Sequence, residues 1–193
     1  MKLKPMKDIL KLKWATIALL FVLAVSCDKD DPEPVNEEEL ITTVIVTFSP
    51  SGGGTNVVAS FRDFDGAGGN APIITNPTLA ANTSYTVSVQ FQNEASSATE
   101  DITEEVEEEA EEHQVFYEVA SGLNLTYTYS DQDGNGNPIG LSGTVQTGAA
   151  SSGSLAVVLV HEPNKTAAGV SGGDATNAGG EEDVRVSFTV TIQ

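Results

Sequence analysis

Cations are scarce in this chain, and most of them stand at its beginning. Only nine of the 193 residues are Lys or Arg, against 28 Asp and Glu, and five of the nine are lysines that precede Trp14. Phosphate binding requires clustered cations, so this composition excludes nucleic acid as a partner. It equally excludes adhesion to an anionic lipid surface through charge.

Cysteine and catalytic motifs are also scarce. Cys27 is the only cysteine, which excludes a disulfide framework, so packing or bound ions must stabilise the domain. Residues 169–173 match the pattern G-x-S-x-G, but they lie in a glycine-rich stretch that is typical of a surface loop, and no histidine follows Ser171. We therefore predict that the protein is not an enzyme.

The longest apolar run, residues 14–25, is too short to cross a membrane, because a spanning helix requires ~20 such residues. Lysines precede the run, and Ser26 and Cys27 follow it. A basic segment, a short apolar segment and small residues in this order are typical of a secretory signal. We predict that residues 1–26 are a signal peptide.

The residues around Cys27 indicate how the exported chain is held. Residues 23–27, LAVSC, resemble the bacterial lipobox, and the acidic DKDD after them resembles the export tag of Bacteroidetes surface lipoproteins. The resemblance implies that Cys27 becomes the new N-terminus and carries acyl chains such as palmitate. Outer-membrane lipid is then the partner, since two or more chains make a stable anchor. The expected location is the outer membrane, facing the cell surface or the periplasm.

Beyond Cys27 the composition divides the chain into two parts. Residues 27–39 are acidic and contain Pro32 and Pro34, which predicts an extended tether. Residues 40–193 have the length of one ordinary domain.

Most of that domain alternates apolar and polar residues, which predicts half-buried antiparallel strands. Gly- and Asn-rich turns separate the strands at the spacing of a β-sandwich. The alternating segments are residues 44–48, 85–91, 123–129 and 184–192. The predicted fold is therefore an all-β, antiparallel β-sandwich.

The segment around Tyr85 carries a more specific resemblance. Residues 79–89, LAANTSYTVSV, resemble a segment of fibronectin type III and immunoglobulin-like domains. In those domains the tyrosine forms a corner by hydrogen bonding to backbone a few residues upstream. The resemblance implies an immunoglobulin-like sandwich and this role for Tyr85.

A weak internal repeat is visible. Residues 61–68, FRDFDGAG, are echoed by residues 129–136, YSDQDGNG, after a strand in each case. Two related halves could form one sandwich or two small ones. We favour one, because a unit of ~70 residues without disulfides buries little core.

An acidic insertion separates the halves. Residues 94–112 contain ten carboxylates and no cation, while Ile102, Val106 and Ala110 recur every four residues. This spacing predicts a short helix, with Ser97 or Asp101 at its start. Its charge suits a solvated or partly disordered segment, or a rim that attracts cations.

The chain's two histidines suggest a metal site. If residues 113–119 and 155–161 are strands, His113 and His161 stand at strand ends on the apolar face, beside Glu112 and Glu162. Imidazole and carboxylate are ligands of zinc and copper. A packed, hydrogen-bonded histidine is the alternative.

Two Asp-rich loops suggest calcium instead. Asp131, Asp133, Asn135 and Asn137 reproduce the first half of a calcium loop, but Ser142 stands where a bidentate glutamate is needed. Asp63 and Asp65 form a poorer version. The alternative is that both are hairpin turns, which Asp-Gly and Asn-Gly favour.

Longer segments resemble short flavobacterial lipoproteins that are labelled as type 1 periplasmic binding fold superfamily proteins. The resemblance runs through residues 104–117, 161–167 and 170–183. That label implies two α/β lobes, whereas the strand pattern predicts β, and we follow the pattern. We expect a lipid-anchored protein that binds a ligand or metal and serves uptake with a TonB-dependent transporter. The alternative is a calcium-stabilised structural or adhesive module.

Overall fold

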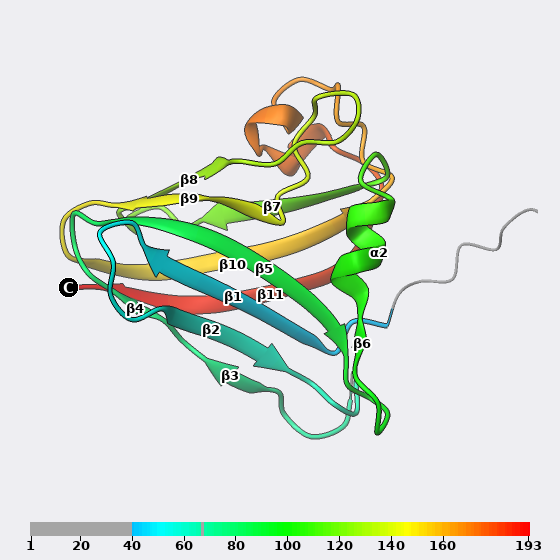
Figure 1. The fold of residues 1–193 in the computed structure, drawn as a ribbon, viewed down its shortest axis with the longest axis horizontal. Coiled ribbons are helices and arrows are strands. Elements are labelled where there is room, and N and C mark those ends of the chain that lie inside the picture. Colours follow the sequence, from blue (N-terminus) through cyan, green and yellow to red (C-terminus); the bar gives the residue numbers. More distant parts are fainter. Residues whose placement is uncertain (1–39, 67) are drawn as a thin grey trace, which may run out of the picture. The chain divides into compact units, whose positions relative to one another are not determined.

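The computed structural model describes residues 40–66 and 68–193, which form two β-sheets (Figure 1). The predicted signal peptide, tether and lipidated Cys27 lie outside the described residues. Within the described part of the chain, no helix is long and apolar enough to cross a membrane.

The larger sheet has the strand order β3-β2-β1-β5-β9-β8, and β6 pairs with the far end of β5. All of these pairs are antiparallel. The strands are β1 (Thr43–Pro50), β2 (Val57–Arg62), β3 (Ile73–Thr75), β5 (Ser84–Asn93), β6 (Glu100–Asp101), β8 (Leu125–Tyr129) and β9 (Ser142–Thr147).

The smaller sheet has the order β4-β11-β10-β7. It contains β4 (Thr78–Leu79), β7 (His113–Val119), β10 (Ser151–His161) and β11 (Glu181–Ile192). Here β10 pairs antiparallel with both β11 and β7, while the two-residue β4 lies parallel to β11.

The core fills the space between the sheets, and its members are the alternating apolar residues of both. Val44, Phe91 and Val157 are fully buried, as is Val190. The prediction of an all-β, antiparallel sandwich is confirmed, with β4–β11 as its one parallel pair among the described strands. The finer immunoglobulin-like or fibronectin-like assignment stays a prediction.

Each of the two halves of the domain, before and after the acidic insertion, contributes strands to both sheets. The strands β8 and β9 extend the larger sheet beside β5, and β4 lies beside β11 in the smaller one. Neither part of the repeat therefore forms a sandwich of its own.

Tyr85 has the contact that its sequence context predicts. Its hydroxyl accepts a hydrogen bond from the backbone N–H of Ala80 at 2.8 Å, and its ring packs edge-on against Phe48. The ring is buried, so this bond satisfies a hydroxyl that would otherwise be costly to bury. The turn before β5 is thereby tied to the strand.

The acidic insertion contains the one α-helix among the described residues, α2 (Ile102–Glu108). Asp101 caps it by accepting a hydrogen bond from the N–H of Thr103. Ile102 and Val106 are buried, as their spacing predicts. Thr103 also exchanges hydrogen bonds with the backbone of Phe91. These contacts hold α2 against β5. After α2 the chain continues to the start of β7.

The segment between β10 and β11 covers the outer face of the smaller sheet. It contains two short 3-10 helices, η1 (Val170–Gly172) and η2 (Ala175–Asn177), coloured orange in Figure 1. Val170 and Ala178 pack there against Phe116, Val158 and Val160. Because β10 is buried on both faces, its sequence is a continuous apolar run instead of an alternating one.

Candidate metal centre

The two histidines, distant in sequence, lie opposite each other at the ends of neighbouring strands. His113 begins β7, His161 ends β10, and the antiparallel register pairs them directly. Their rings are stacked, with centroids 4.7 Å apart and planes 17° apart. Both are buried, with only 2% and 8% of their surface exposed. The strand alternation therefore places both imidazoles on the core side, as the sequence predicts.

Carboxylates surround this histidine pair. Glu112, which directly precedes β7, places Oε2 3.7 Å from Nε2 of His161. The backbone N–H of Glu162 bonds to the carbonyl of Glu112, which keeps the two acidic residues together. Glu112, His161 and Glu162 each offer a ligand atom within 4.8 Å of the others, and so do Glu109, His113 and His161. Three of the four residues predicted for the metal site thus form one group, and the fourth, His113, belongs to a second group that shares His161.

Glu109 is a neighbour that the sequence reading missed. It follows α2 and is four residues before His113, so a reading of α2 as far as its last turn could have found it. Its carbonyl oxygen lies 3.3 Å from Nδ1 of His113. This places the Nδ1 side of the ring against the end of the helix.

Asp183 is the second missed neighbour, and a β-bulge places it. In the β10–β11 pairing Leu159 faces Val184 but Val160 faces Glu182, so Asp183 is an extra residue in β11. Its side chain is only 6% exposed, and its Oδ2 lies 3.9 Å from Nε2 of His113.

The separations between nitrogen and carboxylate suit ligands of a common ion better than hydrogen bonds. Direct hydrogen bonds of this kind measure ~2.7–3.2 Å, whereas two ligands of tetrahedral zinc with bonds of ~2.1 Å are ~3.4 Å apart. The 3.7 Å and 3.9 Å separations at His161 and His113 lie nearer the second value. Imidazole lone pairs lie in the ring planes, so a stacked pair must tilt to share one ion.

Burial also affects the protonation of His113. Desolvation lowers the pKa of His113, and the positive charge that a protonated His161 would carry lowers it further. The backbone carbonyl of Glu109 acts in the opposite direction without prevailing. A lowered pKa favours neutral imidazole, which is the form that binds metal ions.

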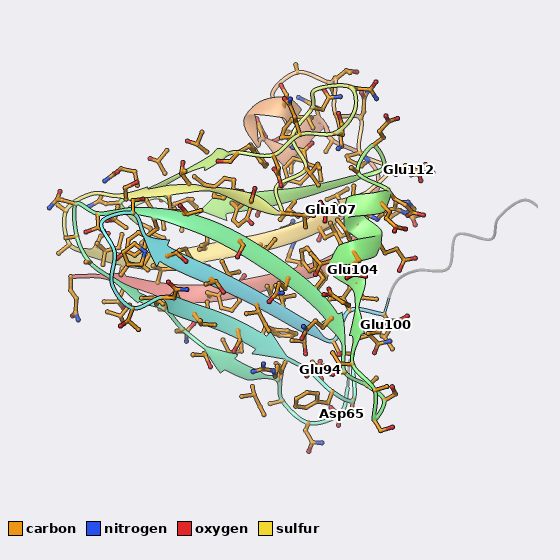
Figure 2. All side chains as sticks on the ribbon, in the orientation of Figure 1. Asp65, Glu94, Glu100, Glu104, Glu107 and Glu112 are labelled. Carbon is orange, nitrogen blue, oxygen red and sulfur yellow. The ribbon has the colours of Figure 1, made fainter. Side chains whose placement is uncertain are left out.

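An acidic edge leads to the histidine pair. Figure 2 shows carboxylates that follow the loops below β6 and then α2, ending with Glu112 beside His161. Glu94 bonds to Arg62, whereas the glutamate side chains of α2 are exposed. Clustered negative charge of this kind raises the local concentration of cations. The labelled members of the edge are Asp65, Glu94, Glu100, Glu104, Glu107 and Glu112.

The second Asp-rich loop contains a cation supplied by the chain itself. Lys165 is buried, and its ammonium donates to Asp133 Oδ2 at 3.0 Å and to the carbonyls of Ala110 and Pro138. The other oxygen of Asp133 accepts the backbone N–H groups of Asn135 and Asn137. The loop is therefore closed around an ammonium.

The carboxylates of two further predicted calcium ligands, Asp131 and Asp65, also accept hydrogen bonds within the protein. The two oxygens of Asp131 accept the N–H groups of Gly140 and Ser142. In the first loop, Asp65 accepts backbone and side-chain hydrogen bonds from Asn70, and these bonds lower its pKa. Asp63 donates its backbone N–H to Thr42. The calcium site stays a prediction, and in the second loop an ion would compete with Lys165.

A separate hollow lies between the edges of the two sheets. Its volume is about 220 Å³, and Gly172 and Gly173 form the wall that belongs to the β10–β11 segment. Three tyrosines also line the hollow, Tyr117, Tyr127 and Tyr129. The hydroxyl of each one donates a hydrogen bond to a backbone carbonyl. The glycine-rich stretch that the sequence predicts as a surface loop thus borders this hollow.

Comparisons with family models, curated proteins and solved structures give no match to the chain. The resemblance to flavobacterial lipoproteins stays an expectation.

Proposed function

We propose that the protein is a lipid-anchored, extracytoplasmic β-sandwich that binds a zinc or copper(II) ion at His113 and His161. The observation that carries the proposal is the pairing of the chain's two histidines, buried and stacked at one strand end, with four carboxylate residues around them. A single packed histidine would not require this convergence.

The chemistry of the donors selects the ion. Two imidazole nitrogens with carboxylate oxygens suit zinc and copper(II), whereas calcium takes oxygen ligands almost exclusively. The acidic edge supports binding by attracting the ion to the exposed side of the pair, where Glu112 and Glu162 stand.

Titration calorimetry on the purified domain tests the proposal. The wild type should bind about one equivalent of zinc, because both imidazoles belong to one site. His113→Ala and His161→Ala should each weaken binding strongly. Glu108→Ala, which removes one exposed carboxylate from α2, is the matched control and should matter little. Equal binding by all four proteins would leave only diffuse attraction to carboxylates.

Binding should also depend on pH in one direction. Protons and the ion compete for the same imidazole nitrogens, so affinity should fall as the pH drops below about 6. The same titrations at several pH values measure this. A pH-independent affinity would mean that histidine is not a ligand.

The anchoring part of the proposal rests on Cys27 and is tested separately. Cys27→Ala should abolish incorporation of labelled palmitate and release the protein from the outer-membrane fraction. Its circular dichroism should equal that of the wild type, because the described fold begins well after that residue. Unaltered palmitate incorporation would contradict the lipoprotein assignment.

A further inference from the structure

We propose that the outer edge of β7 binds an extended peptide with alternating apolar and uncharged polar residues. The peptide adds as a strand beside Tyr117 and Val119, and its apolar side chains enter the hollow of about 220 Å³. This interaction surface is separate from the histidine pair, and it does not depend on a bound metal ion.

The register between β7 and β10 determines which backbone groups face outwards. In an antiparallel pair, alternate residues exchange hydrogen bonds with the partner strand, and the residues between them direct both N–H and C=O away from it. The N–H of Ala120 donates to the carbonyl of Ser154, so the even-numbered residues of β7 face β10. Tyr117 and Val119 therefore direct their backbone N–H and C=O groups towards the outer edge.

The chain itself occupies the first position along this edge. The N–H of Val115 donates to the carbonyl of Ile139 at 2.6 Å, and the carbonyl of Val115 accepts from the Tyr129 hydroxyl at 2.9 Å. The chain then crosses to the larger sheet, where the carbonyl of Leu141 accepts the N–H of Val89. Among the described strands, only β10 pairs with β7. The edge beyond Val115 thus has no strand beside it.

The hollow continues from this edge. Tyr117 and Val119 line one side, residues of β8 line another, and Gly172 and Gly173 close it. Gly173 has a φ of +92°, and a Cβ there would lie 3.3 Å from the Tyr129 ring, so glycine lets the loop pass close to the tyrosine. None of the eight lining residues is charged, although the chain has 28 Asp and Glu. A side chain that enters the hollow should therefore be uncharged.

These features suit an extended peptide. Backbone donors and acceptors at alternate residues match those of an added strand, which is how peptides bind to sheet edges in other proteins. The peptide residues opposite Tyr117 and Val119 would enter the hollow, while the residue between them would lie beside exposed Glu118. The hollow is smaller than the ~300–1,000 Å³ typical of sites for drug-sized ligands, and it suits a few apolar side chains.

A second copy of the chain fits this edge less well. Antiparallel pairing of two β7 edges centred on Glu118 would place this residue directly opposite its copy, and like charges in that position are destabilising. Arg185 already pairs with both Glu118 and Glu182, so it is shared between two carboxylates. The edge therefore favours a partner without an acidic residue at this position.

The first test titrates the purified protein with an acetylated and amidated pentapeptide, Thr-Val-Thr-Val-Thr, in the presence of chelator. Backbone ¹H–¹⁵N spectra should show shifts of the Tyr117 and Val119 amides, and slower hydrogen exchange, because these N–H groups become donors to the added strand. The amide of Phe116 faces β10, so its exchange should not change. The same peptide with both valines N-methylated keeps its side chains but loses two donors, and it should bind at least about tenfold more weakly.

The second test changes the protein instead of the peptide. Val119→Pro removes an outward N–H without removing a hydrogen bond to β10, and proline is tolerated on an edge strand at such a position. Its circular dichroism should equal that of the wild type, while its affinity for the pentapeptide should fall about fivefold or more. If this variant does not fold, the comparison of the two peptides on the wild type still decides.

Three outcomes would overturn the proposal. The first is the absence of amide shifts at Tyr117 and Val119 with millimolar pentapeptide. The second is equal binding of the N-methylated peptide, which would mean that the hollow takes apolar side chains without an added strand. The third is a wild-type dimer in sedimentation that Val119→Pro dissociates, which would assign the edge to a second copy. Zinc binding bears on none of these outcomes.

Discussion

Lys165 and the histidine pair are two buried polar sites that the same short stretch helps to build, and they differ in where a positive charge comes from. Lys165 brings its own ammonium to Asp133 and to the carbonyl of Ala110. Two residues further along the chain, Glu112 approaches His161, whose imidazole carries a charge only when protonated. The first site is complete within the chain, while the second is the one at which we propose that a metal ion binds.

The comparison suggests two different roles for carboxylates in one acidic protein, one in stabilising the fold and one in the proposed binding of an ion. At Asp133 the carboxylate has a structural role. The ammonium of Lys165, in the segment after β10, binds both the Asp-rich loop and the end of the acidic insertion. At His113 and His161, on the proposed function, the neighbouring carboxylates contribute to binding a metal ion. Four predictions test this contrast.

The largest expected effect is the loss of Lys165. Lys165→Met leaves the buried carboxylate of Asp133 without its ammonium, and breaking a buried pair in this way costs about 3–5 kcal/mol. Urea denaturation should show a corresponding fall in the free energy of unfolding.

Two further variants separate charge loss from a general loss of packing. Adding Asp133→Asn to Lys165→Met should recover part of the stability, because no buried charge is then left alone. Arg185→Met breaks exposed ion pairs with Glu118 and Glu182 and should cost at most about 1 kcal/mol. Similar costs for Lys165→Met and Arg185→Met would mean that the buried ammonium has no special role.

The second largest expected effect concerns the histidine pair, and it is an increase in stability instead of a decrease. Zinc at 100 times its dissociation constant should stabilise the wild type by about 2.7 kcal/mol, because it binds only the folded state. Thermal unfolding with and without chelator measures this as a shift in Tm. His113→Ala should remove the shift, whereas Lys165→Met should retain it on a lower baseline. A zinc effect that survives His113→Ala would place the ion elsewhere.

The third effect is acid sensitivity at Asp133. Burial raises its pKa, but the hydrogen bonds from Asn137 and Lys165 outweigh burial and hold the pKa below the ordinary value. A carboxyl whose pKa is lowered by folding stabilises the protein above its unfolded pKa, and this contribution is lost as the pH falls through the folded pKa. The stability difference between wild type and Asp133→Asn should therefore shrink between pH 5 and pH 2. A constant difference would show that the ionised form is not what stabilises the loop.

The smallest expected effect is that of calcium. Since Lys165 already contacts Asp133, millimolar calcium should leave the melting temperature of the wild type unchanged within error, relative to chelator. A rise in melting temperature that Asp133→Ala abolishes would support the calcium interpretation. The variant Lys165→Ala makes the calcium test more sensitive, because it removes the ammonium that competes with calcium for Asp133. Calcium should then stabilise the variant.

The sequence was sufficient for the sandwich and for the face on which each histidine lies, because both follow from alternation. Val115 and Leu159 mark the core face of their strands, and His113 and His161 each stand two residues away on the same faces, whereas their pairing depends on the register between β7 and β10. The helix α2 is similarly read from the spacing of Ile102 and Val106. These are local periodicities, so each can be read without knowledge of the neighbouring strands.

Asp183 and Lys165 could not be found in this way. The position of Asp183 depends on a bulge, which exists only in the register between β10 and β11. Lys165 lies in a polar loop and resembles any solvated lysine, yet three acceptors from separate segments bury it. Both placements are tertiary, because they require contacts between strands and loops that are separate in the sequence.

The strand β11 follows all the other described strands in the sequence, and this order has a kinetic consequence. This strand lies in the interior of the smaller sheet, between β4 and β10, and supplies Phe188 and Val190 to the core. Until it is in place, the apolar faces of β5 and β10 have no complete partner layer, and the bulge that positions Asp183 does not exist. Closure over such long sequence separations is slow, so a chain emerging in N-to-C order stays open until its last strand is available. If the protein is exported as proposed, an open chain is also the form that can be threaded through an export channel.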